Sequence, residues 1–416
     1  MKCLDTVIVL LMTMVLFFPS SYPVIKFGFL AFLLLAYMVE SGKQCLCINS
    51  TIFFLSLVAI ILGLSLNLYD VFLNGLSTRG LNVFVIDICV YLAVMLLLST
   101  RPNINLIFDR AFHISSLLIS TNALLYLLFS VSIGRESYPL MFLDLDYRMG
   151  LGGSGLMAFS TNNLPILIFT LPYMLVHYFY GKTYSKWKKM TLSVCLLASF
   201  FSLRIALIGV IVLSICCLVL YKVLRTKKKL YFLTWMMSLS MMIFSLSLIF
   251  TDGAKLDEFY NLKLANKLNG SDIRYEQFDV WYGYFQEAPL FGHGLTSVNL
   301  IIYKGDQFVH ENVGVIENPF GYELTFAKLL VEIGLIPFLI YTVLTMYIII
   351  QILKIVRDKA IPYQYREYAL AHMFGIVSFI ISANTNGYLL TFGYLWVIFF
   401  PLTSVARYKI KEAISL

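Results

Sequence analysis

The sequence predicts an all-α polytopic membrane protein of about twelve transmembrane helices, and two observations lead to this fold class. Of the 416 residues, 60% are hydrophobic and only 13% are charged, whereas a soluble domain carries about 25% charged residues. The apolar residues fall into repeated runs of roughly 18 or more, which is the length a helix needs to cross a bilayer. Because lipid offers no water to backbone groups, such runs are expected to be helical.

The order of the runs divides the chain into three parts. Residues 1–250 carry nine predicted spans, residues 251–322 form the one long polar interval, and residues 323–416 carry three further spans and a tail. The polar interval is expected to contain short amphipathic helices, including one near 273–285 whose apolar residues recur at helical spacing. The predicted spans lie near 4–19, 22–39, 49–68, 82–99, 109–133, 156–179, 190–203, 205–224, 230–250, 324–353, 367–383 and 388–406.

The distribution of charge sets the predicted topology. Basic clusters at 182–189, 225–229, 354–366 and 407–411 all fall on one face if there are twelve spans, and both termini share that face. Lysine and arginine accumulate on the cytoplasmic side, so the loop at 251–322 is predicted outside the cytoplasmic membrane. From Thr251 to Glu323 there are eleven acidic and five basic residues, which fits that side. The net charge of +8 therefore reflects topology, and no nucleic acid is expected as a partner.

The positions and spacing of the cysteines do not indicate a metal site or a set of disulfide bonds. None of the seven cysteines lies in the long polar loop, and Cys45-x-Cys47 has no partners at zinc-finger spacing. We therefore expect no metal site and no cofactor. Three histidines, His113, His177 and His372, lie near predicted cytoplasmic helix ends and are expected to be structural.

Two arginines are candidate anion-binding residues. Arg204 lies in SFFSLRIALIG with apolar helix on both sides, where a charge is costly and marks a functional site or a paired partner. The alternative is an arginine that snorkels to the headgroups. Arg274 begins the predicted amphipathic helix, and the alternative there is a solvated ion pair with Glu276 or Asp279.

Glu323 is the candidate general base. It lies where the polar loop re-enters the bilayer, and a partly desolvated carboxylate has a raised pKa that suits proton abstraction. The alternative is an acidic residue that is favoured at a helix N-terminus by the macrodipole.

Further candidates line the same predicted side. Arg148 lies in the glycine-rich DYRMGLGGSG, which either brings backbone amides near a phosphate or is a flexible connector. His310 in HEN is a candidate substrate contact, although its spacing is not that of a zinc site. Because arginine binds phosphate oxygens through two parallel hydrogen bonds, this set of arginines suggests a pyrophosphate site at the membrane surface.

Three segments together resemble the bacterial O-antigen polymerase and O-antigen ligase superfamily of membrane glycosyltransferases. The family pattern contains a serine-rich turn with an arginine that opens a helix, as in SFFSLRIALIG. It also contains an arginine, an aromatic residue four positions later and a proline–apolar–aromatic–glycine turn, as in Arg274, Phe278 and PLFGHG. The third element opens at Glu323 and ends at Glu332-Ile333-Gly334. In ligases a histidine typically occupies the position of Glu323, so the polymerase branch is favoured.

The resemblance implies a GT-C-like fold in the bacterial inner membrane and metal-independent transfer at the periplasmic face. Arg204 and Arg274, with help from Arg148, would bind the pyrophosphate of an undecaprenyl-pyrophosphate-linked oligosaccharide donor. Glu323 would deprotonate the acceptor hydroxyl. The donor, a lipid-linked acceptor, membrane lipids and a chain-length regulator are the partners that this interpretation admits. The aromatic residues expected to stack on sugar or cover the lipid are Tyr275, Trp281, Tyr282 and Tyr284.

Two other functions remain open at this point. The nearest is an O-antigen ligase, which transfers finished polymer to the lipid A core. From another class, a transporter or flippase for lipid-linked oligosaccharide would need several intramembrane charges around a cavity, and would leave the long polar loop unexplained. The sequence shows no internal repeat of the kind that many transporters carry.

Overall fold

The structure is a computed structural model of the full chain. It describes residues 3–18, 104–134, 163–181, 184–202, 205–220, 285–292 and 333–383, with shorter pieces within 22–35, 137–161, 282–283, 301–316 and 330–331. The chain divides into two compact units. The first comprises Met1–Tyr22, Asn105–Leu268 and Ile352–Ser382, and the second comprises Pro23–Ile104, Asn269–Gln351 and Ala383–Leu416.

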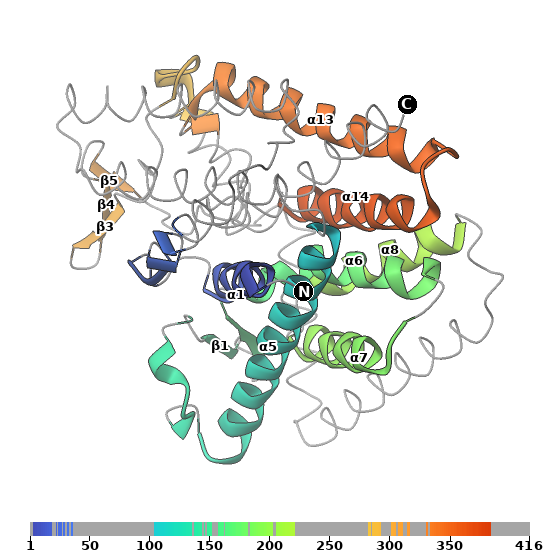
Figure 1. Cartoon of the computed structure of the whole chain (residues 1–416). Helices are drawn as coiled ribbons and strands as arrows, with labels where there is room; N and C mark the ends of the chain where they lie inside the picture. Colours follow the sequence, from blue (N-terminus) through green and yellow to red (C-terminus); the bar gives the residue numbers. More distant parts are fainter. Residues whose placement is uncertain are drawn as a thin grey trace. The chain divides into compact units, whose positions relative to one another are not determined.

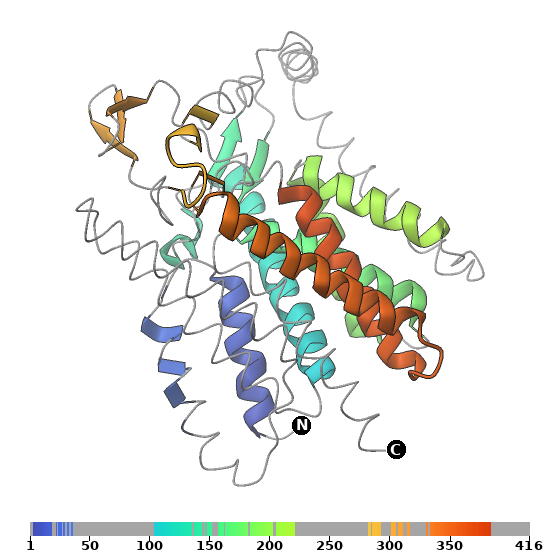
Figure 2. The same ribbon diagram turned by 90° about the horizontal axis from the view of Figure 1, so that it is seen from above.

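The first unit is a bundle of apolar helices (Figure 1). In chain order its described helices are α1 (Cys3–Phe17), α5 (Ile104–Ser132), α6 (Leu167–Tyr180), α7 (Lys186–Phe201), α8 (Ile205–Leu220) and α14 (Tyr363–Ala383). Figures 1 and 2 both show α1 lying beside α5. Five of the buried residues of α1 recur at the three- and four-residue spacing of one helix face, namely Ile8, Leu11, Met12, Val15 and Leu16.

Helix α6 is the centre of this bundle. Every residue from Leu167 to Phe179 is buried, so this helix is covered on all sides by protein. It packs against α7 and α8, and α14 lies along it at Gly375, where an added Cβ would come within 2.8 Å of the Phe169 ring. A helix that is apolar around its whole circumference is expected in such a position.

Polar side chains fix how the chain enters α6. The short 3₁₀ helix Leu164–Ile166 precedes it, with Pro165 in its first turn, where a missing N–H costs nothing. The Asn163 amide donates to the carbonyl of Phe17 at the end of α1 (2.8 Å), and Thr161 donates to Asn163 (2.8 Å). The predicted span at 156–179 therefore starts later than expected, because residues 157–160 form strand β2 (Met157–Ser160).

Strand β2 pairs antiparallel with β1 (Arg148–Leu151), so that Arg148 lies opposite Ser160. The second unit contains a further antiparallel sheet of β3 (Ile301–Lys304), β4 (Gln307–His310) and β5 (Gly314–Ile316). Its strands are rich in β-branched and aromatic residues, which favour extended backbone. Short strands thus supplement the predicted all-α fold in two segments where only helices or connectors were expected.

The predicted span at 324–353 is interrupted at Gly334. This glycine has φ +73°, a left-handed conformation that ends a helix. Helix α13 then runs from Leu335 to Arg357 and contributes its first part to the second unit. Apart from α6 and α13, the described helices α1, α5, α7, α8 and α14 agree with the predicted spans to within about five residues.

Within the described residues, one helix is long and apolar enough to cross a bilayer by length and composition, Ile104–Ser130. Several of the predicted spans lie within residues 36–103 and 221–281, which are outside the described part of the chain. The twelve-span topology and the division at residues 250 and 322 therefore remain predictions.

Candidate functional site

The serine-rich end of α7 belongs to SFFSLRIALIG, one of the three segments that carry the family resemblance. Helix α7 ends at Phe201 and α8 begins at Ile205. The hydroxyl of Ser199 donates to the Cys195 carbonyl (2.8 Å) and that of Ser202 donates to the Ser199 carbonyl (2.8 Å). Both serines are buried, and their hydroxyls donate to carbonyls of the same helix, so neither donor is left without a partner. Arg204 follows this turn in sequence and lies outside the described residues.

The proline–apolar–aromatic–glycine turn follows a short helical segment. Residues 282–283 and 285–287 are helical and Pro289–Phe291 form a turn, after which Gly292 has φ +70°. The Gly292 amide donates to the Ala288 carbonyl (2.9 Å). The side chain of Tyr282 is 52% exposed.

This turn contacts the segment that contains Gly334. The amide of Leu335 donates to the Pro289 carbonyl (2.9 Å) and that of Ile336 donates to the Leu290 carbonyl (3.1 Å). The second of the three family elements is therefore hydrogen-bonded, within the second unit, to the two residues that directly follow the third element.

The other predicted site residues are placed only in part. Arg148 lies in β1 of the first unit, opposite Ser160, and His310 lies in β4 of the second unit, between Ile301 of β3 and Gly314 of β5. The remaining candidates lie outside the described residues: Arg204, Arg274, Tyr275, Trp281, Tyr284 and Glu323.

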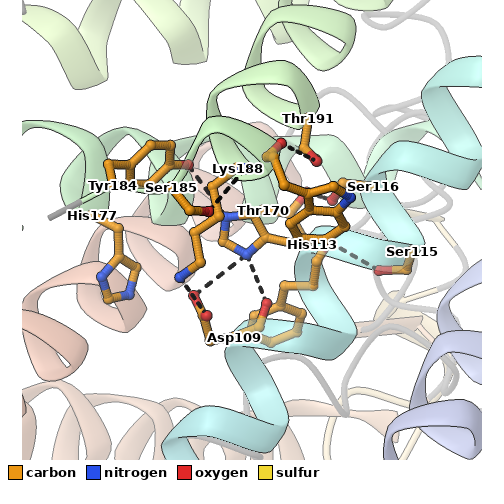
Figure 3. A network of polar contacts seen from close by, with 12 residues as sticks. Asp109, His113, Ser115, Ser116, Thr170, His177, Tyr184, Ser185, Lys188 and Thr191 are labelled. Carbon is orange, nitrogen blue, oxygen red and sulfur yellow. Dashed lines mark hydrogen bonds and ion pairs between the residues drawn. The ribbon is translucent and has the colours of Figure 1, made fainter.

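A separate polar network crosses the first unit (Figure 3). Lys188 in the first turn of α7 reaches Asp109 on α5, with Nζ 2.6 Å from Oδ2. His113, one helical turn after Asp109, has Nδ1 2.7 Å from the Asp109 carbonyl oxygen and Nε2 3.2 Å from the Tyr184 hydroxyl. Because a carbonyl oxygen only accepts, Nδ1 of His113 carries the hydrogen, and Nε2 accepts from Tyr184.

Tyr184 is suited to that donor role. Burial and the nearby Asp109 carboxylate raise the pKa of Tyr184 well above its ordinary value. Its phenol therefore remains protonated throughout the neutral and moderately alkaline range. The Lys188 ammonium also lies 5.9 Å from the centre of the Tyr184 ring, at cation–π distance.

A second pair joins α6 to α14. Nδ1 of His177 lies 2.6 Å from Oε1 of Glu367, and the exposed fractions of the two side chains are 5% and 14%. The Tyr363 hydroxyl donates to the Tyr180 carbonyl, and the two tyrosine rings stack with their centres 5.1 Å apart. Burial and the Glu367 carboxylate raise the pKa of Tyr363 to about 12, so this donor also persists at neutral pH.

His372 on α14 is enclosed by aromatic rings. The centres of Phe108, Tyr173 and Phe112 lie 5.4, 5.1 and 6.0 Å from the imidazole centre. The prediction that the three histidines are structural stays a prediction, but all three pack between helices of one bundle. Within the described residues no group of three or more His, Cys, Asp or Glu side chains has the arrangement of a metal site.

The network joins α5 to the first turn of α7 and joins α6 to α14. Asp109 is 2% exposed, and its charge is compensated by Lys188. Sequence reasoning missed this pair because the carboxylate lies in an apolar run and the lysine lies in a basic cluster assigned to topology. The spacing Asp109-x-x-x-His113 was a readable sign that two polar groups share one helix face.

Comparison with known families adds the last observation. Residues 189–342 match the family model described as O-antigen ligase. This range covers most of α7, all of α8, the Pro289–Gly292 turn and the start of α13. Helices α5, α6 and α14, which carry most of the polar network, lie outside it. No curated protein matches the chain.

Proposed function

We propose, from the premise that residues 189–342 form a domain of the O-antigen ligase family, that this chain polymerises lipid-linked oligosaccharide repeat units. Members of the family are membrane glycosyltransferases that act on lipid-linked glycans. The enzyme class excludes the transporter alternative. The finer assignment to the polymerase branch rests on Glu323, which stands where ligases typically have a histidine.

One observation supports this site more than any other. The matched range contains every residue proposed for chemistry, Arg204, Arg274 and Glu323, although these are widely separated in sequence. It also contains the candidate sugar contacts Tyr275, Trp281, Tyr282 and His310, whereas Arg148 lies outside it.

In the proposed reaction, Arg204 and Arg274 bind the pyrophosphate of the undecaprenyl-linked donor at the periplasmic face. The acceptor sugar hydroxyl attacks the anomeric carbon of the donor while Glu323 accepts the hydroxyl proton. A new glycosidic bond forms, the bond from the anomeric carbon to the pyrophosphate oxygen breaks, and undecaprenyl pyrophosphate leaves. Fixed guanidinium groups stabilise the negative charge that develops on this leaving group.

Single substitutions test these roles. In cells that lack their own polymerase, Arg204→Ala, Arg274→Ala and Glu323→Gln are expected to abolish the ladder of surface glycan, with protein levels unchanged. Arg135→Ala is the matched control, because it removes an arginine on the same predicted side that has no proposed role. Normal ladders from either arginine variant would remove the pyrophosphate role, and an active Glu323→Gln protein would remove the base.

The ligase remains the second candidate, because the matched family model carries that description. Deletion of the gene separates the two activities. Loss of a polymerase leaves single repeat units attached to the lipid A core, and loss of a ligase leaves the core bare while polymer accumulates on the carrier lipid. We expect the first phenotype.

A further inference from the structure

The start of α13 makes a backbone contact to which the proposed reaction assigns no task. The first N–H groups of a helix lack partners within that helix. Helix α13 begins at Leu335, and the amides of Leu335 and Ile336 donate instead to the carbonyls of Pro289 and Leu290, at 2.9 and 3.1 Å. We name these two hydrogen bonds, with the contact at Gly334, the backbone latch.

Gly334 is the pivot of the backbone latch. Its amide donates to the Leu330 carbonyl (2.8 Å), which closes the preceding helical turn. Its carbonyl accepts from the Phe338 amide (3.2 Å), which opens α13. With φ at +73°, one residue therefore ends one helical segment and begins the next.

The contact at Gly334 also leaves no room for a side chain. A Cβ at this position would lie 2.5 Å from the Leu290 carbonyl carbon and 2.5 Å from the Gly292 nitrogen, and would clash with the Phe291 nitrogen. These are backbone atoms, so no rotamer change relieves the overlap. Any side chain at position 334 must push the two segments apart.

We propose that Gly334 is a positioning residue for glycosyl transfer, which acts by holding the Pro289–Gly292 turn against the start of α13. Glu323 lies eleven positions before Gly334, and Arg274 lies fifteen positions before Pro289. The backbone latch thus fixes together the ends of the two segments that carry the proposed base and a proposed donor-binding arginine. This inference rests on the proposed roles of Arg274 and Glu323.

Two substitutions separate the close contact from the unusual backbone angle. Asparagine adopts the left-handed conformation more readily than alanine but carries the same Cβ. If the backbone latch positions the site, Gly334→Asn and Gly334→Ala both lower kcat about 100-fold, because a misplacement of about 1 Å costs that much. KM for the lipid-linked donor is expected to stay within about threefold, since the pyrophosphate contacts remain.

Gly283→Ala is the matched control for these variants. Gly283 lies in the helical segment just before the same turn, and an added Cβ there meets nothing within 4 Å. Its kcat is expected to equal that of the wild type. If Gly334→Asn also has wild-type kcat, the proposal is overturned, because the added Cβ does not matter. Any loss in Gly334→Ala then comes from the local backbone angle alone.

A cross-link reports on the latch without an activity assay. Leu290 and Ile336 are 53% and 38% exposed, so cysteines at both positions are open to a short bis-maleimide, which adds to one thiol at each end. In purified full-length protein, Leu290→Cys/Ile336→Cys is expected to give the cross-linked peptide by mass spectrometry. Adding Gly334→Asn is expected to lower its yield several-fold, and an equal yield would contradict the latch.

The same assays separate failure of this inference from failure of the proposed function. If Arg274→Ala and Glu323→Gln remain active, the proposed site is wrong, and the cross-link yields still decide whether Gly334 sets the contact. If those two variants are inactive while Gly334→Asn is fully active, the proposed function stands and the positioning role fails.

Discussion

Asp109 shows how a single charged residue is accommodated in an apolar bundle. Its carboxylate is almost completely buried, and a buried charge is tolerated only when it is paired and hydrogen-bonded. Lys188 supplies the ion pair from the start of α7, where Ser185 accepts the Lys188 amide as the N-cap. The backbone of Lys188 is thus held by the N-cap and its side chain by the ion pair with Asp109. These two interactions lie in the first turn of α7 and set its register against α5.

Lys188→Met is therefore expected to destabilise the protein by about 3 kcal/mol, because it leaves Asp109 buried without its partner. Thermal unfolding of the purified protein in detergent measures the loss. Lys189→Met is the control, since the neighbouring lysine side chain is exposed. Adding Asp109→Asn to Lys188→Met should recover part of the stability, and a Lys188→Met protein as stable as Lys189→Met would show that the pair contributes nothing.

At the scale of elements, the packing of α14 on α6 depends on the absence of a side chain at Gly375. A Cβ at this position would lie 2.8 to 3.0 Å from three carbons of the Phe169 ring. That ring is itself fully buried between helices, so it has little space to move. Close helix approach at a small residue is a common means of packing helices in membranes.

We expect Gly375→Ala to lower stability by about 1–3 kcal/mol through overpacking. Gly209→Ala on α8 is the matched control, because a Cβ there meets nothing within 4 Å. Since alanine favours helix over glycine by about 1 kcal/mol, this control should be neutral or stabilising. Opposite signs for the two changes in the thermal midpoint would support the close contact, and a stabilised Gly375→Ala protein would refute it.

The elements also show which features a sequence can predict. Apolar runs gave α1, α5, α7 and α14, because helix formation in such runs follows from length and hydrophobicity alone. The family pattern ends a helix at Gly334, but the span drawn from hydrophobicity at 324–353 ran through this residue, and the strand at 157–160 was missed, since both features depend on local backbone geometry inside apolar sequence. The ion pair of Asp109 with Lys188 required knowledge of which helices are neighbours, and helical spacing cannot supply that.

At the scale of the whole molecule, the family match and the polar network occupy different parts of the chain. The matched range holds the proposed chemistry, whereas the network lies mainly on α5, α6 and α14 outside it. Because the charge pairs stabilise the helices outside the matched range, the residues of the matched range can change to suit the substrate without loss of this stabilisation. Substitution of Lys188 is therefore expected to lower the thermal midpoint clearly. At temperatures where the variant is still folded, its kcat/KM should change little.

The proposed use of arginines also makes a prediction about the complete enzyme. Fixed guanidinium groups carry a permanent positive charge, so stabilisation of the departing pyrophosphate needs no divalent cation. Purified full-length protein in detergent, given lipid-linked repeat units, should form longer glycans at the same rate with and without EDTA, as measured by electrophoresis of the released chains. The Glu323→Gln protein serves as the inactive control. A rate that falls at least tenfold in EDTA and returns with added Mg²⁺ would show that the leaving group is stabilised by a metal ion instead of by Arg204 and Arg274.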